Sequence, residues 1–287
     1  MSDTTSAIRL RGDGVTLAAD RWDPTTQPST GTALLLHGGG QTRHSWQRTG
    51  QRLADHGWSA MTIDARGHGD SDWAVDGDYS IAAHARDLAA VVASLDTRPV
   101  LVGASLGGMA SLIAQGADPT LARGLVLVDI TPSAEPAGLE KISSFMRDGL
   151  AGFDSLDDAA AAVAAYNPHR RRPPRPDGLR KNLRWRDGRW YWHWDPRMMA
   201  DRSNSPELAG VREEQARAAA RAITVPTLLI RGAQSDVVSE ENAEELLRLI
   251  PTARQIDVGG AGHMVSGDDN DILSEGLLEF LGNDVLN

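Results

Sequence analysis

A short glycine motif surrounds Ser105 and indicates that this side chain is a nucleophile. Ser105 is the central residue of Gly103-Ala104-Ser105-Leu106-Gly107, a G-x-S-x-G pattern. The apolar run Val100–Val102 precedes the motif and the apolar helical pattern Leu106–Gln115 follows it, so the serine lies where a strand turns sharply into a helix. Glycines are required because side chains would clash in such a turn, and the strain leaves the serine oxygen exposed. The motif predicts nucleophilic attack by Ser105 on an acyl group.

A serine hydroxyl is a poor nucleophile at neutral pH and needs a neighbouring base, for which histidine is the side chain best suited. Of the eight histidines, His263 ends the glycine-rich stretch Gly259-Gly260-Ala261-Gly262-His263. This stretch follows the last strand pattern and precedes the last helical pattern, where a loop can present an imidazole to the serine. We therefore predict that His263 is the base.

The base needs a carboxylate that fixes its tautomer and stabilises its positive form. Asp236 follows the strand pattern Thr227–Ile230 after a loop of several residues, whereas Asp129 directly ends the pattern Leu125–Val128. Both lie at carboxyl ends of strands, where ligands and catalytic groups gather in an open parallel sheet. We predict Asp236, because its longer loop lets the carboxylate reach His263. Asp129 is the alternative, with support of the following turn as its other role.

The tetrahedral intermediate also needs N–H donors for its negative oxygen. The backbone N–H of Leu106, at the start of a helix, is predicted to be one donor. The second donor is expected in the glycine loop that follows His37, where the backbone can approach a substrate closely. We predict Gly39, with Gly38 and Gly40 as alternatives that would contact the substrate, and we interpret His37 as a structural hydrogen-bonding residue.

The elements that must position these groups are short runs of Leu, Val and Ile that alternate with helical patterns, which is typical of buried parallel strands joined by crossover helices. The predicted strands are Ala33–Leu36, Ala60–Ile63, Val100–Val102, Leu125–Val128, Thr227–Ile230 and Arg254–Val258. The predicted helices are Ser45–His56, Ile81–Leu95, Leu106–Gln115, Glu240–Leu249 and Ile272–Leu281. Near the start, Ile8–Leu10 and Val15–Ala19 flank Gly12-Asp13-Gly14, which indicates an antiparallel hairpin. The pattern predicts an α/β fold with a mostly parallel twisted sheet covered by helices on both faces.

The regular alternation stops after Pro132 and resumes at Val225. We therefore predict a core domain of residues 1–132 and 223–287 and an inserted, mainly helical cap of residues 133–222. Inside the cap, the alanine-rich stretch Asp157–Ala165 predicts a helix, and the basic, proline-rich stretch Arg170–Pro176 predicts a stiff surface connector.

The predicted cap is rich in aromatic residues, and the chain has eight tryptophans for only three phenylalanines. Trp192 lies among Trp185, Trp190, Tyr191 and Trp194. These side chains predict either an aromatic wall over the substrate pocket, with Trp192 as a substrate contact, or the interior of the cap itself.

Met109 belongs to the helix after Ser105. It is a further candidate for the substrate pocket, although the hydrophobic core is the favoured alternative.

Taken together, the motifs resemble those of α/β-hydrolases of the cap-bearing group, which includes esterases, lactonases, carbon–carbon bond hydrolases, epoxide hydrolases and cofactor-free haloperoxidases. Besides the serine motif, the matching segments are His37-Gly38-Gly39 running to Ser45-Trp46, Asp64-Ala65-Arg66-Gly67-His68-Gly69-Asp70-Ser71, the Asp236 loop and Gly262-His263. The resemblance covers nearly the whole chain, and it implies that His68 is structural. Epoxide hydrolases carry an aspartate in place of Ser105, so the serine favours acyl chemistry.

Composition excludes several other classes of function. Apolar residues make up 41% and charged residues 24% of the chain, as in ordinary globular proteins. The formal net charge of −10 gives no electrostatic reason to bind nucleic acid or an anionic membrane. The chain contains no cysteine, and no H-E-x-x-H or comparable ligand spacing occurs, so we expect neither thiol chemistry nor a metal or other cofactor. The polar start predicts a cytoplasmic protein.

The sequence thus favours hydrolysis of a carboxylic ester or lactone through an acyl-Ser105 intermediate, with a small, neutral and partly apolar substrate. A carbon–carbon bond hydrolase or a perhydrolase would use the same three residues and stays an alternative. A ligand-binding protein on a silent hydrolase scaffold is the alternative from another class.

Overall fold

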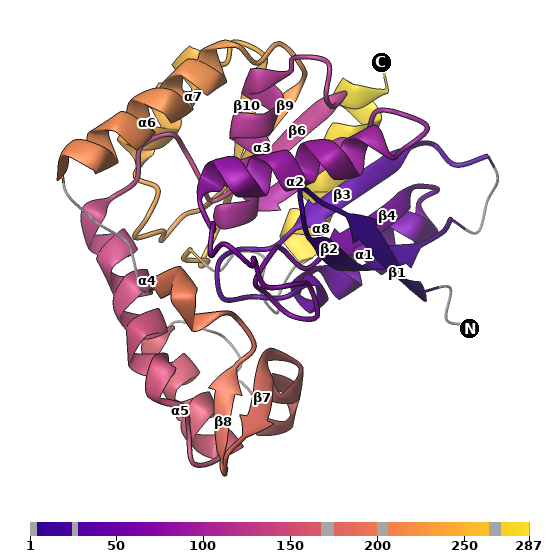
Figure 1. Cartoon of the computed structure of the whole chain (residues 1–287). Helices are drawn as coiled ribbons and strands as arrows, with labels where there is room; N and C mark the ends of the chain where they lie inside the picture. Colours follow the sequence, from indigo (N-terminus) through magenta and orange to yellow (C-terminus); the bar gives the residue numbers. More distant parts are fainter. Residues whose placement is uncertain (1–4, 25–27, 168–174, 200–205, 264–270, 287) are drawn as a thin grey trace.

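The computed structural model describes residues 5–24, 28–167, 175–199, 206–263 and 271–286. An eight-stranded sheet in the order β1-β2-β4-β3-β5-β6-β9-β10 forms its centre (Figure 1). The strands are β1 Thr5–Arg11, β2 Thr16–Trp22, β3 Thr32–Leu36, β4 Ser59–Ile63, β5 Val100–Ala104, β6 Gly124–Val128, β9 Thr227–Gly232 and β10 Ala253–Val258. β1 and β2 form the predicted antiparallel hairpin at one edge, β2 is antiparallel to β4, and the other neighbours are parallel. The predicted fold class is confirmed.

Helices cover both faces of the sheet, because each face carries its own apolar layer (Figure 1). On one face lie α2 (Ile81–Ala93), α3 (Leu106–Ala117), α6 (Pro206–Arg221) and α7 (Glu240–Leu249). On the other face lie α1 (Gln47–Asp55), which follows a short 3₁₀ turn, and α8 (Asp271–Phe280). Among the described helices none is long and apolar enough to cross a lipid bilayer.

We use the term insertion for the chain between β6 and β9. It contains α4 (Pro136–Asp148), α5 (Leu156–Tyr166), the strands β7 (Leu183–Arg186) and β8 (Arg189–Trp192), and α6. The first four of these elements project from one side of the core (Figure 1). The sequence predicted a mainly helical cap here and did not identify β7 and β8, which pair as an antiparallel hairpin.

The last helix of the insertion departs from the predicted division into core and cap. α6 falls within residues 133–222, yet Ala216 and Ala220 of α6 are buried in the same apolar cluster as the sheet and α3. A side chain on Gly116 of α3 would clash with Ala219, so the two helices are in close contact. The proposed boundaries stay a prediction, and residues 170–174 of the predicted basic connector lie outside the described residues.

The register of the parallel strands brings several loops to one edge of the sheet. Leu36 of β3 pairs with Gly103 of β5, and Ala104 of β5 pairs with Val128 of β6. β9 and β10 end side by side, with Gly232 opposite Val258. The loops after these five strands therefore leave the sheet together at its carboxyl edge, which is where parallel sheets hold their ligands.

Candidate active site

Ser105 sits on a strained turn between β5 and α3. Its backbone has φ 45° and ψ −112°, a conformation that costs a residue with a Cβ on the order of 1–3 kcal/mol. Hydrogen bonds from Ser105 N–H to Val128 C=O (3.2 Å) and from Gly107 N–H to His37 C=O (3.2 Å) hold the turn in place. The strain directs the serine side chain out of the sheet at its carboxyl edge.

The glycines of the motif allow α3 to begin directly against the sheet. A Cβ on Gly103 would lie 2.5 Å from backbone atoms of Gly107, and a Cβ on Gly107 would lie 2.6 Å from the carbonyl oxygen of Leu36. Both distances are shorter than atoms tolerate, so larger residues would push the helix and its serine away from the sheet.

His263 follows β10 and donates its Nδ1–H to Asp129 Oδ2 at 2.7 Å. Asp129 is fully buried at the end of β6, and its carboxylate also accepts hydrogen bonds from Gly232 N–H (2.8 Å) and Ser235 Oγ (2.6 Å). A carboxylate only accepts, so the imidazole proton is on Nδ1 and the lone pair of Nε2 is available as a base. No direct hydrogen bond joins His263 to Ser105 in the part of the chain that the structure describes.

This arrangement corrects the predicted partner of His263. Asp236 lies in the loop after β9, but its carboxylate pairs with Lys141 of α4 at 2.6 Å, and both side chains are nearly half exposed. The Lys141 ammonium lowers the pKa of Asp236 against the opposing effect of burial. The prediction that Asp236 holds His263 is therefore wrong, and the alternative, Asp129, occupies that position.

The longer loop after β9 contributes to the site through a different residue. Ser235, next to Asp236, accepts hydrogen bonds from Val237 N–H (3.1 Å) and Val238 N–H (3.0 Å), and its own hydroxyl bonds Asp129. The loop therefore supports the buried carboxylate while Asp236 turns outward to the insertion.

Both predicted oxyanion donors have N–H groups without an acceptor among the described residues: Gly39 and Leu106. Gly38 N–H donates to Gln41 Oε1 (3.1 Å) and Gly40 N–H donates to His68 Nε2 (3.1 Å), so the two alternatives to Gly39 are already engaged. These bonds favour Gly39 as the donor in the glycine loop.

The glycine loop also comes close to Ser105. A Cβ on Gly38 would lie 3.3 Å from Ser105 Cβ. The loop after β3 and the turn after β5 therefore face each other, which is the arrangement that the predicted pair of N–H donors requires.

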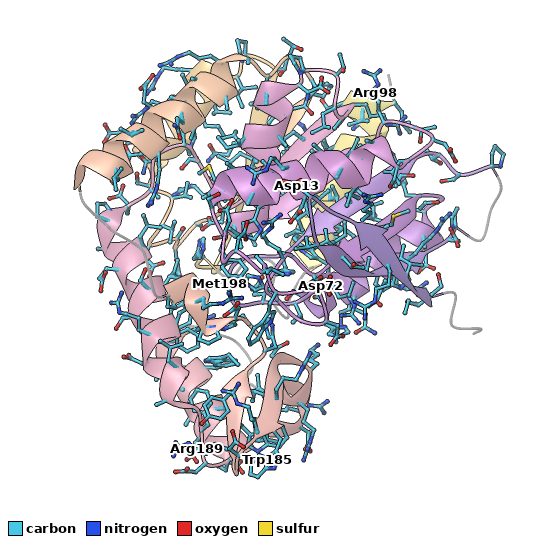
Figure 2. The ribbon with its side chains drawn as sticks, viewed as in Figure 1. Asp13, Asp72, Arg98, Trp185, Arg189 and Met198 are labelled. Atoms are coloured by element: carbon cyan, nitrogen blue, oxygen red, sulfur yellow. The ribbon has the colours of Figure 1, made fainter. Side chains whose placement is uncertain are left out.

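The insertion supplies a largely apolar wall beside this loop. A Cβ on Gly40 would lie 3.7 Å from Met146 Cε and 3.9 Å from Trp194 Nε1. Met146, Trp194 and Met198 form one buried cluster, and Met198 lies where the insertion faces the core (Figure 2). Sequence reasoning missed Met146, and it named Trp194 only as one member of an aromatic group.

The other two predicted pocket residues lie in apolar clusters. Trp192 packs within the insertion against Phe145 and Phe153, with ring centroids 5.8 Å and 5.3 Å away. Met109 is partly buried against the core cluster. Their substrate contacts stay predictions.

A strained serine after the fifth strand of a mostly parallel sheet, together with a hydrogen-bonded Asp–His pair at the same edge of the sheet, defines the class of α/β-hydrolases. The profile of the alpha/beta hydrolase fold matches residues 33–269, so the chain belongs to this family. It is an enzyme of the hydrolase class, as the names of its relatives also indicate.

Two curated relatives and one solved structure illustrate the likeness. "Esterase Rv0045c" of Mycobacterium tuberculosis is 31% identical over 268 residues, which cover 90% of this chain and 84% of the relative. The 2-(acetamidomethylene)succinate hydrolase of Mesorhizobium japonicum is 29% identical over 232 residues, 80% of each chain. A crystal structure of E-2-(acetamidomethylene)succinate hydrolase has a TM-score of 0.82 at 25% identity and covers 97% of this chain and 99% of its own.

Proposed function

We propose that this protein is a serine hydrolase that cleaves a carboxylic ester or lactone through an acyl-Ser105 intermediate. The observation that carries the proposal is the bond from His263 Nδ1–H to the buried Asp129 carboxylate. It leaves the other imidazole nitrogen unprotonated on the sheet edge where the strained Ser105 turn emerges.

In the first half of the proposed reaction, His263 Nε2 takes the Ser105 hydroxyl proton as Oγ attacks the carbonyl carbon. The N–H groups of Gly39 and Leu106 stabilise the negative oxygen. The C–O bond to the leaving group then breaks, and the departing alkoxide takes the proton from His263. In the second half, water gives a proton to His263 and its oxygen attacks the acyl carbon. The bond from that carbon to Ser105 Oγ then breaks, His263 returns the proton to Oγ, and the acid leaves.

The surroundings of the glycine loop support a small, neutral and partly apolar substrate. Met146, Trp194 and Met198 are buried together on the insertion side of the loop. Both cations of α4 are paired with carboxylates, Lys141 with Asp236 and Arg147 with Glu140. An apolar acyl or alcohol group fits such a wall, whereas the proposed chemistry needs polar donors only at the carbonyl oxygen.

The test is labelling of the purified protein with a fluorophosphonate probe, with Ser105→Ala as the control. We expect labelling of the wild type and its loss in the control. Wild-type protein that stays unlabelled would refute the proposed mechanism.

Turnover of a substrate panel then sorts the chemistry. The panel contains short-chain esters, lactones, vinylogous diketones and 2-(acetamidomethylene)succinate, the substrate in the name of one relative. We expect turnover of esters or lactones. Exclusive turnover of the diketones would instead assign carbon–carbon bond hydrolysis to the same residues.

A further inference from the structure

One buried histidine of the insertion reaches across to the glycine loop of the core. His193, 2% exposed, follows β8. Its Nδ1 accepts a hydrogen bond from Gly69 N–H at 2.6 Å, and its Nε2 contacts Gly40 C=O at 3.2 Å. An amide N–H only donates, so Nδ1 carries the lone pair and Nε2–H donates to Gly40.

A second buried histidine holds Gly40 from its other backbone group. His68 Nε2 accepts from Gly40 N–H at 3.1 Å, and His68 Nδ1–H donates to Arg66 C=O at 3.0 Å. The His68 and His193 rings lie 5.8 Å apart. Gly40 therefore has both its N–H and its C=O bound by imidazoles, one from the core and one from the insertion.

A third histidine sets the direction of the neighbouring peptide. His37 Nδ1–H donates to Gly38 C=O at 2.7 Å, while His37 Nε2 accepts from Ala65 N–H at 3.0 Å. In a planar trans peptide the C=O and the N–H point in opposite directions. The Gly39 N–H must therefore point away from His37. The Gly40 N–H belongs to the next peptide and the Gly40 C=O to the one after it, so the bonds of His68 and His193 restrict the rotation of the two peptides that follow the Gly39 N–H.

From this geometry we infer that His193 is a positioning residue of the oxyanion loop: the insertion fixes the Gly39 N–H donor through the Gly40 carbonyl. The inference rests on the proposed function, because it assigns a catalytic consequence to the orientation of that N–H. It gives the insertion a part in the chemical step in addition to any contact with the substrate.

Burial keeps the histidine in the form that this role requires. The pKa of His193 is lowered to about 3, mainly by burial and further by His37, while Asp64 and Gly40 C=O oppose the shift. The ring is therefore neutral near pH 7. Protonation would turn its acceptor nitrogen into a donor facing Gly69 N–H, and the bond would be lost.

Other contacts hold this part of the insertion on the core without His193. Asp195 N–H donates to Gly67 C=O at 2.9 Å, and Tyr79 Oη donates to Asp195 Oδ2. These contacts allow His193 to be changed without releasing the segment, and they offer a matched control, because Tyr79→Phe weakens the attachment but leaves both bonds to Gly40.

The experiment compares His193→Asn, His193→Gln and Tyr79→Phe with the wild type. The Asn oxygen takes the place of Nδ1 and keeps the bond from Gly69, but its side chain is too short to reach Gly40. The Gln amide nitrogen takes the place of Nε2 and can restore the donor to Gly40. kcat and KM are measured with an ester or lactone that the wild type turns over, per active site titrated with the fluorophosphonate, and folding is followed by urea unfolding.

We expect His193→Asn to lower kcat roughly 10- to 100-fold, because a misplaced donor costs up to about 100-fold in rate. We expect KM to change by less than about threefold and fluorophosphonate labelling to be slower. We expect His193→Gln and Tyr79→Phe to stay within about fivefold of the wild-type kcat, the equivalent of about 1 kcal/mol.

Three results would overturn the inference. They are an unchanged kcat in His193→Asn, equal losses in the Asn and Gln variants, and an equal loss in Tyr79→Phe, which would assign the effect to attachment of the insertion in general. An unlabelled wild type is a separate outcome, since it refutes the proposed function before any variant is compared.

Discussion

Replacement of Asp129 by Asn tests the assignment of the acid, with Asp236→Asn as the matched control. The carboxylate of Asp129 accepts from Gly232 N–H through Oδ1 and from His263 and Ser235 through Oδ2. The Asn amide places one acceptor, its oxygen, and one donor, its NH₂ group, at the positions of these two carboxylate oxygens. If the Asn oxygen keeps Gly232, its NH₂ group faces His263, which must then carry its proton on Nε2.

In that tautomer Nε2 has no lone pair that could accept the Ser105 hydroxyl proton, because the lone pair is on Nδ1. The opposite orientation of the amide places NH₂ against Gly232 N–H, so two donors face each other in a buried site. We therefore expect Asp129→Asn to lower kcat by about 10⁴-fold, as the same change does in a well-studied serine protease, which corresponds to about 5 kcal/mol in the activation barrier.

The control carries the same chemical change at a more exposed site. Asp236→Asn removes the ion pair with Lys141, whose side chains are 43% and 49% exposed. Exposed ion pairs contribute about 0.2–1 kcal/mol to stability, so we expect a small stability change and a kcat within about fivefold of the wild type.

The assay is steady-state hydrolysis of an ester or lactone that the wild type turns over. Urea unfolding determines the folded fraction of each variant. Equal losses of kcat in the two variants, or a larger loss in Asp236→Asn, would refute the assignment of Asp129.

Three further predictions concern the turn at Ser105, the buried His193 and the apolar wall of the insertion. Gly107→Ala places a Cβ 2.6 Å from the Leu36 carbonyl oxygen, so we expect the free energy of unfolding to fall by about 1–3 kcal/mol in urea denaturation, and an unchanged midpoint would show that α3 can shift freely. The folded-state pKa of His193, about 3, lies below its ordinary value of 6.5, so the unfolded chain binds the proton first and stability falls as pH drops from about 6.5 towards 3. The slope due to this residue is up to about 1.4 kcal/mol per pH unit, and His193→Gln should lose it, whereas parallel pH profiles of the two proteins would contradict the assignment. Trp194→Phe keeps an aromatic ring but reduces the apolar surface of the wall beside Gly40, so we expect KM to rise by about two- to tenfold with kcat preserved. An unchanged KM would show that the indole does not contact the substrate.

The positions of Ser105 and His263 at one edge of the sheet could be predicted from the sequence because their signals are local. The glycines around Ser105 act on the same turn that they occupy, and the stretch before His263 follows its strand directly. The partner of His263 had to be chosen between Asp129 and Asp236, which both follow strands, and loop length favoured the wrong residue. Asp129 needs no loop, because its positive φ of 51° and its place at the end of β6, next to β5, already turn the carboxylate towards the site.

The insertion was harder to predict, for physical reasons that differ between its parts. The hairpin β7–β8 carried a usable signal, since Asp187-Gly188 has φ values of 49° and 81° between two short strands, as a tight hairpin turn requires. His193 carried none. Its partners, Gly40 and Gly69, are more than a hundred residues away in the chain, and a single histidine beside tryptophans has no pattern that points to them.

The insertion meets the core on both sides of the proposed reacting groups. On one side, α4 lies against the loop after β9, where Gly138 contacts the Asp236 backbone and Lys141 binds its carboxylate. The same loop supports Asp129 through Ser235. On the other side, His193 binds the glycine loop. A simple cover would affect only the entry and binding of substrate. Because the contacts of Gly138 and His193 end on the loops that support Asp129 and Gly39, we expect substitutions at these two residues to change kcat. Loss of the exposed Lys141–Asp236 pair should leave kcat within about fivefold of the wild type, and substitutions in the apolar wall should change mainly KM.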